Sequence, residues 1–282
     1  MYEEYWKLSE KPFENTPDPR FLYSSPRHEE ALSRMLYVIK EHKGAGMLTG
    51  EYGSGKTLLS RVLLEELSSD QYQTAIIFNP RLPSLELIKE IIYQLGGNTL
   101  SIMPKTDLLH GLNEILYKNK KEDKNTVIVI DEAQAIPSDS GFEELRLLLN
   151  FQLNENFLLT LILLGQPELK EKINSLPQLR QRLAVRYHLK ALSHFETKEY
   201  VNHRLEVVDA KKGIFQEEAF HEIYRYSAGI PRRINNICDL ALLVGCGKGL
   251  EGIDKTTIIE VAQDLEETSV DMEERTGVST HG

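Results

Sequence analysis

The sequence predicts an α/β fold, in which a parallel sheet lies between helical layers, followed by a smaller part made only of helices. Residues 126–130 and 157–165 are almost unbroken runs of β-forming and apolar residues, typical of strands buried on both faces. Helical periodicity alternates with such runs up to about residue 192, and only helical patterns follow. We therefore expect a three-layer α/β sandwich over residues 1–192 and an all-helical part over 193–266.

The expected elements follow one another with short connections. In the sandwich, strands are expected over 45–49, 73–79, 126–130, 157–165 and at the end of 176–189, and helices over 26–39, 57–67, 83–95, 105–118 and 138–153. The helical part is expected to contain helices over 194–209, 216–227, 231–245 and 255–266, separated by glycine and proline. Residues 267–282 are acidic and bear Ser, Thr and Gly, which predicts a disordered tail.

An N-terminal arm precedes the first strand and is assigned to the α/β part. Several prolines predict that it begins as extended and turn structure. Its aromatic residues Phe13, Phe21 and Tyr23 have two interpretations, which the sequence leaves open. They could form one wall of a base pocket, or they could pack against the sheet.

A glycine-rich segment after the first strand fits the phosphate-binding pattern G-x-x-x-x-G-K-[ST]. Glycines allow the loop to curl so that backbone N–H groups face a polyphosphate, and the following helix adds its positive end. Lys56 is expected to reach the β- and γ-phosphates, and the Thr57 hydroxyl to ligate Mg²⁺. The residues expected to contact the nucleotide here are Gly50, Glu51, Tyr52, Gly53, Ser54, Gly55, Lys56, Thr57 and Leu58.

Polar side chains follow two of the buried strands. Asp131 and Glu132 end the strand over 126–130, at the edge where open α/β sheets bind ligands. Asp131 is expected to hold the Mg²⁺ shell, and Glu132 to orient and deprotonate an attacking water. Gln166 ends the next strand and is interpreted as a group that contacts the γ-phosphate or the water, with an ordinary turn residue as the alternative.

Arginines form two further candidate groups. Arg180, Arg182 and Arg186 precede and enter the last strand, and one of them is expected to stabilise a transferred phosphoryl group in a neighbouring subunit. The pattern does not show which of the three has this role; Arg182 is selected, and surface charge or contact with nucleic-acid phosphates is the alternative for each. Arg232 lies in the first turn of a helix, where a cation is unfavourable unless an anion such as a bound nucleotide meets it.

Composition limits the class of protein. The net charge of −10 argues against a surface that binds nucleic acid throughout, although a local basic patch remains compatible with it. The N-terminus is acidic and aromatic, unlike a secretory signal, and no apolar run reaches transmembrane length. Cys238 and Cys246 are about 12 Å apart along one expected helix, too far for a disulfide. These features predict a cytoplasmic location.

Taken together, the ordered motifs resemble those of AAA+ ATPases, and within that class the chain is similar to the ExeA/GspA group of general-secretion ATPases. The specific similarities are Lys11-Pro12-Phe13, Pro17-Asp18-Pro19-Arg20-Phe21-Leu22-Tyr23, His28-Glu29-Glu30-Ala31-Leu32, Asp131-Glu132-Ala133-Gln134, Leu164-Gly165-Gln166-Pro167-Glu168-Leu169 and Leu179-Arg180-Gln181-Arg182. The resemblance runs from about residue 1 to 266. It implies a Walker A and Walker B pair, a sensor 1 at Gln166, a sensor 2 at Arg232 and a helical lid.

The resemblance implies an ATPase that uses ATP and Mg²⁺ to assemble or remodel a protein partner, such as a secretion or pilus component. Members of the group often continue into a transmembrane helix and a peptidoglycan-binding part, which are not expected in this chain. We therefore expect a cytoplasmic protein, peripheral to the inner membrane through a partner, that forms rings or filaments. The alternative is an ATP-controlled regulator of the transposition type, a switch that assembles on DNA.

Overall fold

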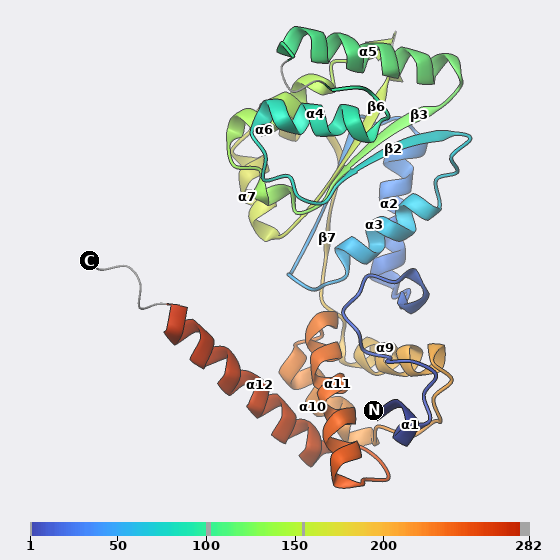
Figure 1. Ribbon diagram of the computed structural model, residues 1–282, viewed down its shortest axis with the longest axis vertical. Helices are drawn as coiled ribbons and strands as arrows, with labels where there is room; N and C mark the ends of the chain where they lie inside the picture. The colour runs from blue at the N-terminus through green and yellow to red at the C-terminus, as the bar shows by residue number, and fades with distance from the viewer. Residues whose placement is uncertain (1, 100–102, 154–155, 277–282) are drawn as a thin grey trace. The chain divides into compact units, whose positions relative to one another are not determined.

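The computed structural model describes residues 2–99, 103–153 and 156–276 (Figure 1). The chain divides into two compact units. The α/β unit consists of Pro26–Tyr52 and Lys56–Lys190. The helical unit consists of the described residues of Met1–Ser25, Gly53–Gly55 and Ala191–Gly282.

The α/β unit is built on a five-stranded sheet of the order β2-β3-β6-β1-β7. In that order the strands are Tyr72–Ile77, Asn125–Ile130, Leu159–Gly165, Ala45–Gly50 and Leu183–Leu189. Every neighbouring pair is parallel, which confirms the predicted parallel sheet. The carboxyl ends of β1, β3 and β6 meet at one edge, because Thr49 pairs with Gly165 and Ile130 with Leu163.

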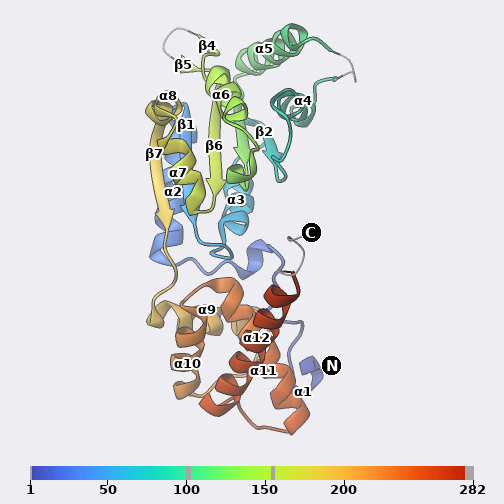
Figure 2. The ribbon, with the colours of Figure 1, turned by 90° about the vertical axis from the view of Figure 1, so that its left-hand side faces the viewer.

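Helices cover both faces of this sheet and form the outer layers of the sandwich (Figures 1 and 2). One layer contains α2 (Pro26–Lys40) and α3 (Lys56–Glu65), and the other contains α4 (Ser84–Gln94), α5 (Lys105–Lys121), α6 (Asp139–Leu148), α7 (Pro167–Asn174) and α8 (Pro177–Arg182). Successive residues of β3 alternate between the two apolar cores: Val127 and Val129 belong to the α2–α3 core, and Ile128 and Ile130 to the other. Burial on both faces explains the unbroken apolar pattern of the strand.

One predicted helix is shorter than expected. The sequence predicted helix up to about residue 153, but α6 ends at Leu148. A short antiparallel pair follows, formed by β4 (Gln152–Leu153) and β5 (Asn156–Phe157). Asn150 has a low helix propensity, and the N–H of Leu158 donates to the carbonyl of Phe151, so the chain turns back toward β6.

The helical unit contains α9 (His194–Val207), α10 (Glu217–Ser227), α11 (Pro231–Lys248) and α12 (Lys255–Thr276). Two of these helices are longer than the sequence predicted. Helix α11 continues through Gly245 and ends before Gly249, which has the left-handed φ of 68° that favours glycine. Helix α12 continues ten residues past 266, into the segment expected to be a disordered tail; residues 277–282 of that tail lie outside the described residues.

The N-terminal arm was assigned to the α/β part, but the structure includes its side chains in the core of the helical unit. The arm starts with a helix, α1 (Tyr2–Trp6), where extended and turn structure was expected. The Trp6 indole N–H donates to the carbonyl of Leu242 over 2.9 Å. Phe13 and Phe21 are buried in the same core, so neither the base-pocket wall nor packing against the sheet describes them.

Both cysteines lie on α11, as the sequence predicted, and neither forms a disulfide. Cys238 is fully buried among apolar side chains, and this burial raises the pKa of its thiol well above the usual range. A buried thiol of this kind acts as a small core residue and is unreactive.

Candidate active site

The predicted phosphate-binding loop connects β1 to α3 at the carboxyl edge of the sheet. Gly53 and Gly55 have φ values of 80° and 96°, which glycine adopts without the clash that a Cβ would introduce. Lys56 is only 4% exposed, and its Nζ donates to the carbonyls of Gly50 (2.8 Å) and Glu51 (2.9 Å). The ammonium group is therefore held against the backbone of its own loop.

The other loop residues differ in exposure. Gly50 and Ser54 are buried, whereas the side chains of Glu51 and Tyr52 are exposed. Leu58 follows Thr57 in the first turn of α3 and is half-buried. Tyr52 is the aromatic residue of this loop, and its side chain is 59% exposed.

A hydrogen bond joins this loop to the end of β3. The Thr57 hydroxyl donates to Oδ2 of Asp131 over 2.6 Å, and the N–H of Glu132 donates to Oδ1 over 2.8 Å. Asp131 is only 2% exposed, and this burial raises the pKa of its carboxyl above the usual range despite the two donors. A buried carboxylate beside a hydroxyl is a donor set that suits Mg²⁺, a cation that prefers oxygen ligands.

Glu132 occupies a turn with unusual backbone geometry. Its φ of 50° and ψ of 38° are left-handed, a conformation that is uncommon for residues other than glycine. Oε2 of its carboxylate accepts two hydrogen bonds, from Nε2 of Gln134 (2.5 Å) and from Nε2 of Gln166 (3.0 Å). The structure thus brings Glu132 and Gln166 together, although they follow different strands, β3 and β6.

The three candidate arginines near β7 lie on other elements, whereas the backbone N–H of Arg232 donates to the carbonyl of Gly53 in the loop over 3.2 Å. Arg180 and Arg182 are in the last turn of α8, and Arg186 is exposed on the edge strand β7. Nη2 of Arg182 lies 3.3 Å from Oδ1 of Asn150. In the described part of the chain, no hydrogen bond or ion pair links these arginines to Asp131 or Glu132. Arg232 is in the first turn of α11, in the helical unit.

Two residues of this region had no role in the sequence analysis. Gln134 was visible only as the fourth residue of the Asp-Glu-Ala-Gln stretch, which does not show where its amide points. Lys172 had no sequence signal. It extends from α7, and its Nζ donates to the carbonyls of Gln134 (2.8 Å) and Ile136 (3.1 Å).

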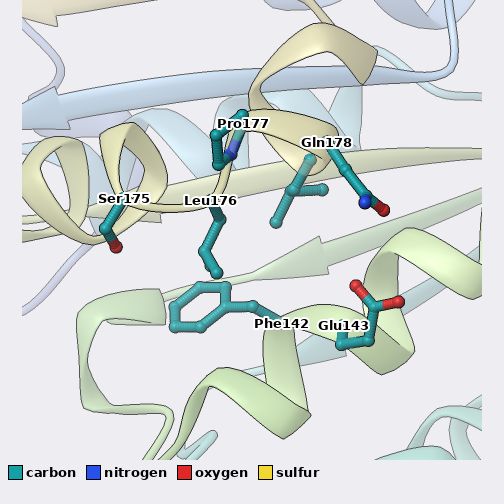
Figure 3. Close-up of a pocket in the computed structure, with 7 residues that line it drawn as sticks. Phe142, Glu143, Ser175, Leu176, Pro177 and Gln178 are labelled. Atoms are coloured by element: carbon teal, nitrogen blue, oxygen red, sulfur yellow. The ribbon is translucent and has the colours of Figure 1, made fainter.

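A pocket of about 300 Å³ lies between α6 and the junction of α7 with α8 (Figure 3). Phe142 and Leu176 form its apolar part, and the side chains of Glu143 and Gln178 are polar groups at its border. None of the predicted site residues lines this pocket. It is therefore distinct from the phosphate-binding loop, although Nζ of Lys172 lies 5.9 Å from the centre of the Phe142 ring.

Known proteins resemble this chain in sequence and in fold. Residues 39–173 match the family model described as an AAA domain. Residues 39–173 thus resemble an AAA domain, and the α/β unit has the fold of the AAA+ P-loop nucleoside triphosphatases. The chain is 39% identical over 254 residues to the general secretion pathway protein A of Aeromonas hydrophila, which confirms the predicted resemblance to the ExeA/GspA group. The match covers 88% of this chain and 46% of that protein, so the chain spans about half the length of this relative.

Solved structures show the same fold at low identity. The Aeropyrum pernix ORC1 protein, solved in complex with DNA, has a TM-score of 0.72 and 17% identity, over 96% of this chain and 73% of that one. The Thermotoga maritima RuvB Holliday junction branch migration motor has a TM-score of 0.57 and 17% identity, over 86% of this chain and 70% of that one. In the described part of the chain, no helix combines the length and apolar character that crossing a membrane requires.

Proposed function

We propose that this chain binds ATP with Mg²⁺ and hydrolyses it. The observation that carries the proposal is the hydrogen bond between Thr57 and Asp131, because it joins the phosphate-binding loop to the acidic end of β3. Mg²⁺ needs both groups near the β- and γ-phosphates. Thr57 and Asp131 would hold the ion when it is bound, directly or through its water shell, and the ion would neutralise charge that develops on the phosphates.

Each remaining residue has a proposed role in the same reaction. Lys56 and the loop from Gly50 to Leu58 bind the phosphates, and Glu132 accepts the proton of the attacking water. Gln166 contacts the γ-phosphate or that water, and its hydrogen bond to Glu132 supports this role. Arg232 contacts the nucleotide from the helical lid.

The proposed active site is completed by an arginine from an adjacent copy of the chain. Arg182 is the proposed residue, and Arg180 and Arg186 are the alternatives. In support, these guanidinium groups form no hydrogen bond or ion pair with Asp131 or Glu132 of their own chain in the described residues, and a guanidinium can stabilise charge on a transferred phosphoryl group. This proposal implies self-association into a ring or filament.

The partner is proposed to be a protein that the ATPase assembles or remodels, of the secretion or pilus type. The support is the name of the 39% identical relative, a general secretion pathway protein. We accordingly propose a cytoplasmic location, peripheral to the inner membrane through that partner.

A DNA-binding switch is the second candidate. Arg186 is exposed on an edge strand and could contact phosphates, and one structure with the same fold was solved with DNA. A salt titration separates the two candidates, because each protein–phosphate contact releases counterions and steepens the salt dependence of the affinity. Binding that vanishes only at raised salt supports the switch, and no binding at low salt excludes it.

The test of the main proposal is phosphate release from ATP and Mg²⁺, measured against protein concentration, with the particle mass determined in parallel. Specific activity that rises with concentration, together with a mass that increases when ATP is added, would support an active site shared between subunits. No phosphate release at any concentration would overturn the proposal.

A further inference from the structure

We propose that Gln134 is a positioning residue that fixes the carboxylate of Glu132, and that Gly165 lacks a side chain in order to make room for it. This inference rests on the proposed role of Glu132 as the base that accepts a proton from water. Gln134 lies in the short helical turn η2 (Ala133–Ala135), two residues beyond the glutamate, and is half-buried.

The side-chain amide of Gln134 both donates and accepts a hydrogen bond. Its Nε2 donates to Oε2 of Glu132 over 2.5 Å, and its Oε1 accepts the backbone N–H of Gln166 over 3.1 Å. Gln166 in turn donates from its own Nε2 to the same Oε2 of Glu132 over 3.0 Å. The three residues therefore form a closed ring of hydrogen bonds between the ends of β3 and β6.

This ring determines how the carboxylate is oriented. The last torsion of a glutamate side chain has a broad energy profile, so its intrinsic preference does not fix the carboxylate plane. Two amide donors on one oxygen fix it. Oε1 of Glu132 receives no hydrogen bond from the residues that the structure describes, and this is the oxygen left to accept one from a water.

Gly165 explains why the amide of Gln134 can occupy its place. A Cβ at position 165 would lie 2.6 Å from Oε1 of Gln134 and 2.7 Å from Cδ2 of Leu169. The backbone of Gly165 is regular strand, so this glycine is required by space and not by an unusual φ. Any other residue there would push the amide away from Glu132 or from the N–H of Gln166.

Lys172 holds the backbone of the same segment. Its two hydrogen bonds to the carbonyls of Gln134 and Ile136 fix the chain on both sides of Ala135. Lys172 belongs to α7, which begins directly after Gln166. The segment that carries Gln134 is thus tied to the same element as Gln166, so the two amides keep their relative positions.

The first test is Gln134→Met, which keeps the length of the side chain and removes both hydrogen bonds. We expect kcat for ATP to fall roughly tenfold to a hundredfold, since small errors in the placement of a catalytic group reduce the rate by such factors. The affinity for ATP should stay within about twofold, because a positioning residue does not hold the ground state. The matched control is Gln94→Met on the exposed face of α4, which should leave kcat unchanged.

The second test is a double-mutant cycle with Gly165→Ala, which should lower kcat in the wild-type background. In the Gln134→Met background the same change should have little further effect on kcat, because the amide that it displaces is gone. If the two substitutions lowered kcat by factors that multiply in the double variant, Gly165 would not act through Gln134. If Gly165→Ala does not fold, as judged by its melting temperature, the kcat and affinity of Gln134→Met decide alone.

The outcomes separate this inference from the proposed function. No turnover by the wild-type protein removes the proposed function itself, and normal turnover by Glu132→Gln removes the proposed role of Glu132, on which this inference rests. Suppose that the wild type is active and Glu132→Gln is inactive. A wild-type kcat for Gln134→Met would then overturn only the proposed role of Gln134.

Discussion

Thr57 and Asp131 are 74 residues apart in the chain, yet the hydroxyl of the first lies 2.6 Å from the carboxylate of the second. The contact exists because β1 and β3 both flank β6, which brings the loop after β1 and the turn after β3 to one edge of the sheet. The parallel order of strands is thus the physical cause of the site.

Lys56→Ala and Glu132→Gln should separate binding from hydrolysis. Removal of the Lys56 ammonium deletes the charge that is proposed to bind the phosphates, so ATP affinity should fall by about tenfold or more. Glu132→Gln keeps the shape of the side chain but removes its basicity, so it should bind ATP normally and release phosphate at least about a hundredfold more slowly. Calorimetric titration with ATP and single-turnover phosphate release measure the two effects. Equal losses of affinity in both variants would contradict this division of roles.

The buried carboxyl of Asp131 should make stability depend on pH in the absence of Mg²⁺. Its pKa in the folded protein is raised above the ordinary value of 3.8, so the folded state holds the proton more tightly than the unfolded chain does. The associated stability is present below the unfolded pKa and is lost as pH rises through the folded pKa. At neutral pH, Asp131→Asn should therefore melt at a higher temperature than the wild type, and the difference should shrink toward acidic pH.

Mg²⁺ with nucleotide should reduce or reverse this difference in melting temperature. In the proposed site the ion would pair with the ionised carboxylate, so it should raise the melting temperature of the wild type more than that of Asp131→Asn. Thermal melts at several pH values, with and without Mg²⁺ and ADP, measure both effects. Asp70→Asn, an exposed substitution outside the site, is the control. A wild type that is more stable than Asp131→Asn at neutral pH without Mg²⁺ would show that the burial of this carboxyl has no net cost.

Two inactive variants should regain activity when they are mixed. Arg182→Ala removes the proposed arginine and keeps Glu132, whereas Glu132→Gln removes the base and keeps Arg182. At a mixed interface the intact arginine of one copy can meet the intact glutamate of the other, so ATP turnover should rise well above that of either variant alone. The measurement is phosphate release as a function of mixing ratio, with a maximum near equal amounts. If mixtures with Arg182→Ala stayed inactive at every ratio, and mixtures with Arg180→Ala or Arg186→Ala recovered activity, the role of the arginine supplied by the neighbouring copy would pass to Arg180 or Arg186.

The sequence predicted those features that depend on local pattern. Buried strands such as β3 were visible because a strand covered on both faces contains few polar residues, and the phosphate-binding loop because its glycines have a fixed spacing. The hydrogen-bond partner of a side chain was not predictable in this way when the two residues are far apart in the sequence. The amide of Gln134 reaches the backbone of Gln166 only because β3 and β6 are neighbours, and this pairing leaves no trace in either segment alone.

The arm shows the same limit at the level of a domain. Its prolines predicted extended structure, but Tyr2 and Trp6 lie one helical turn apart and both are buried in the helical unit. Burial of this apolar pair outweighs the weak intrinsic tendency of a five-residue segment to form a helix. The sequence order of the arm, directly before the α/β part, favoured the wrong core for these aromatic side chains.

Trp6 should therefore contribute to the stability of the helical unit, although it lies at the other end of the chain. The side chain is 6% exposed, its indole N–H donates to the carbonyl of Leu242, and Gly245 of α11 leaves room for its ring, since a Cβ there would lie 2.9 Å from Cζ2. Trp6→Ala should destabilise the unit by about 3–5 kcal/mol, as large-to-small changes in cores do. Trp6→Phe should cost about 0.5–1.5 kcal/mol, because it retains much of the apolar area and loses one hydrogen bond, to a carbonyl of Leu242 that lies within α11.

Chemical unfolding followed by circular dichroism measures these differences in the free energy of unfolding. Trp6 is the single tryptophan of the chain, so its fluorescence in the wild type also reports directly on release of the arm. A fluorescence transition that coincides with loss of helix is expected, because the arm and α11 share one core. If Trp6→Ala unfolded at the same denaturant concentration as the wild type, the arm would be an accessory to the helical unit and not part of its core.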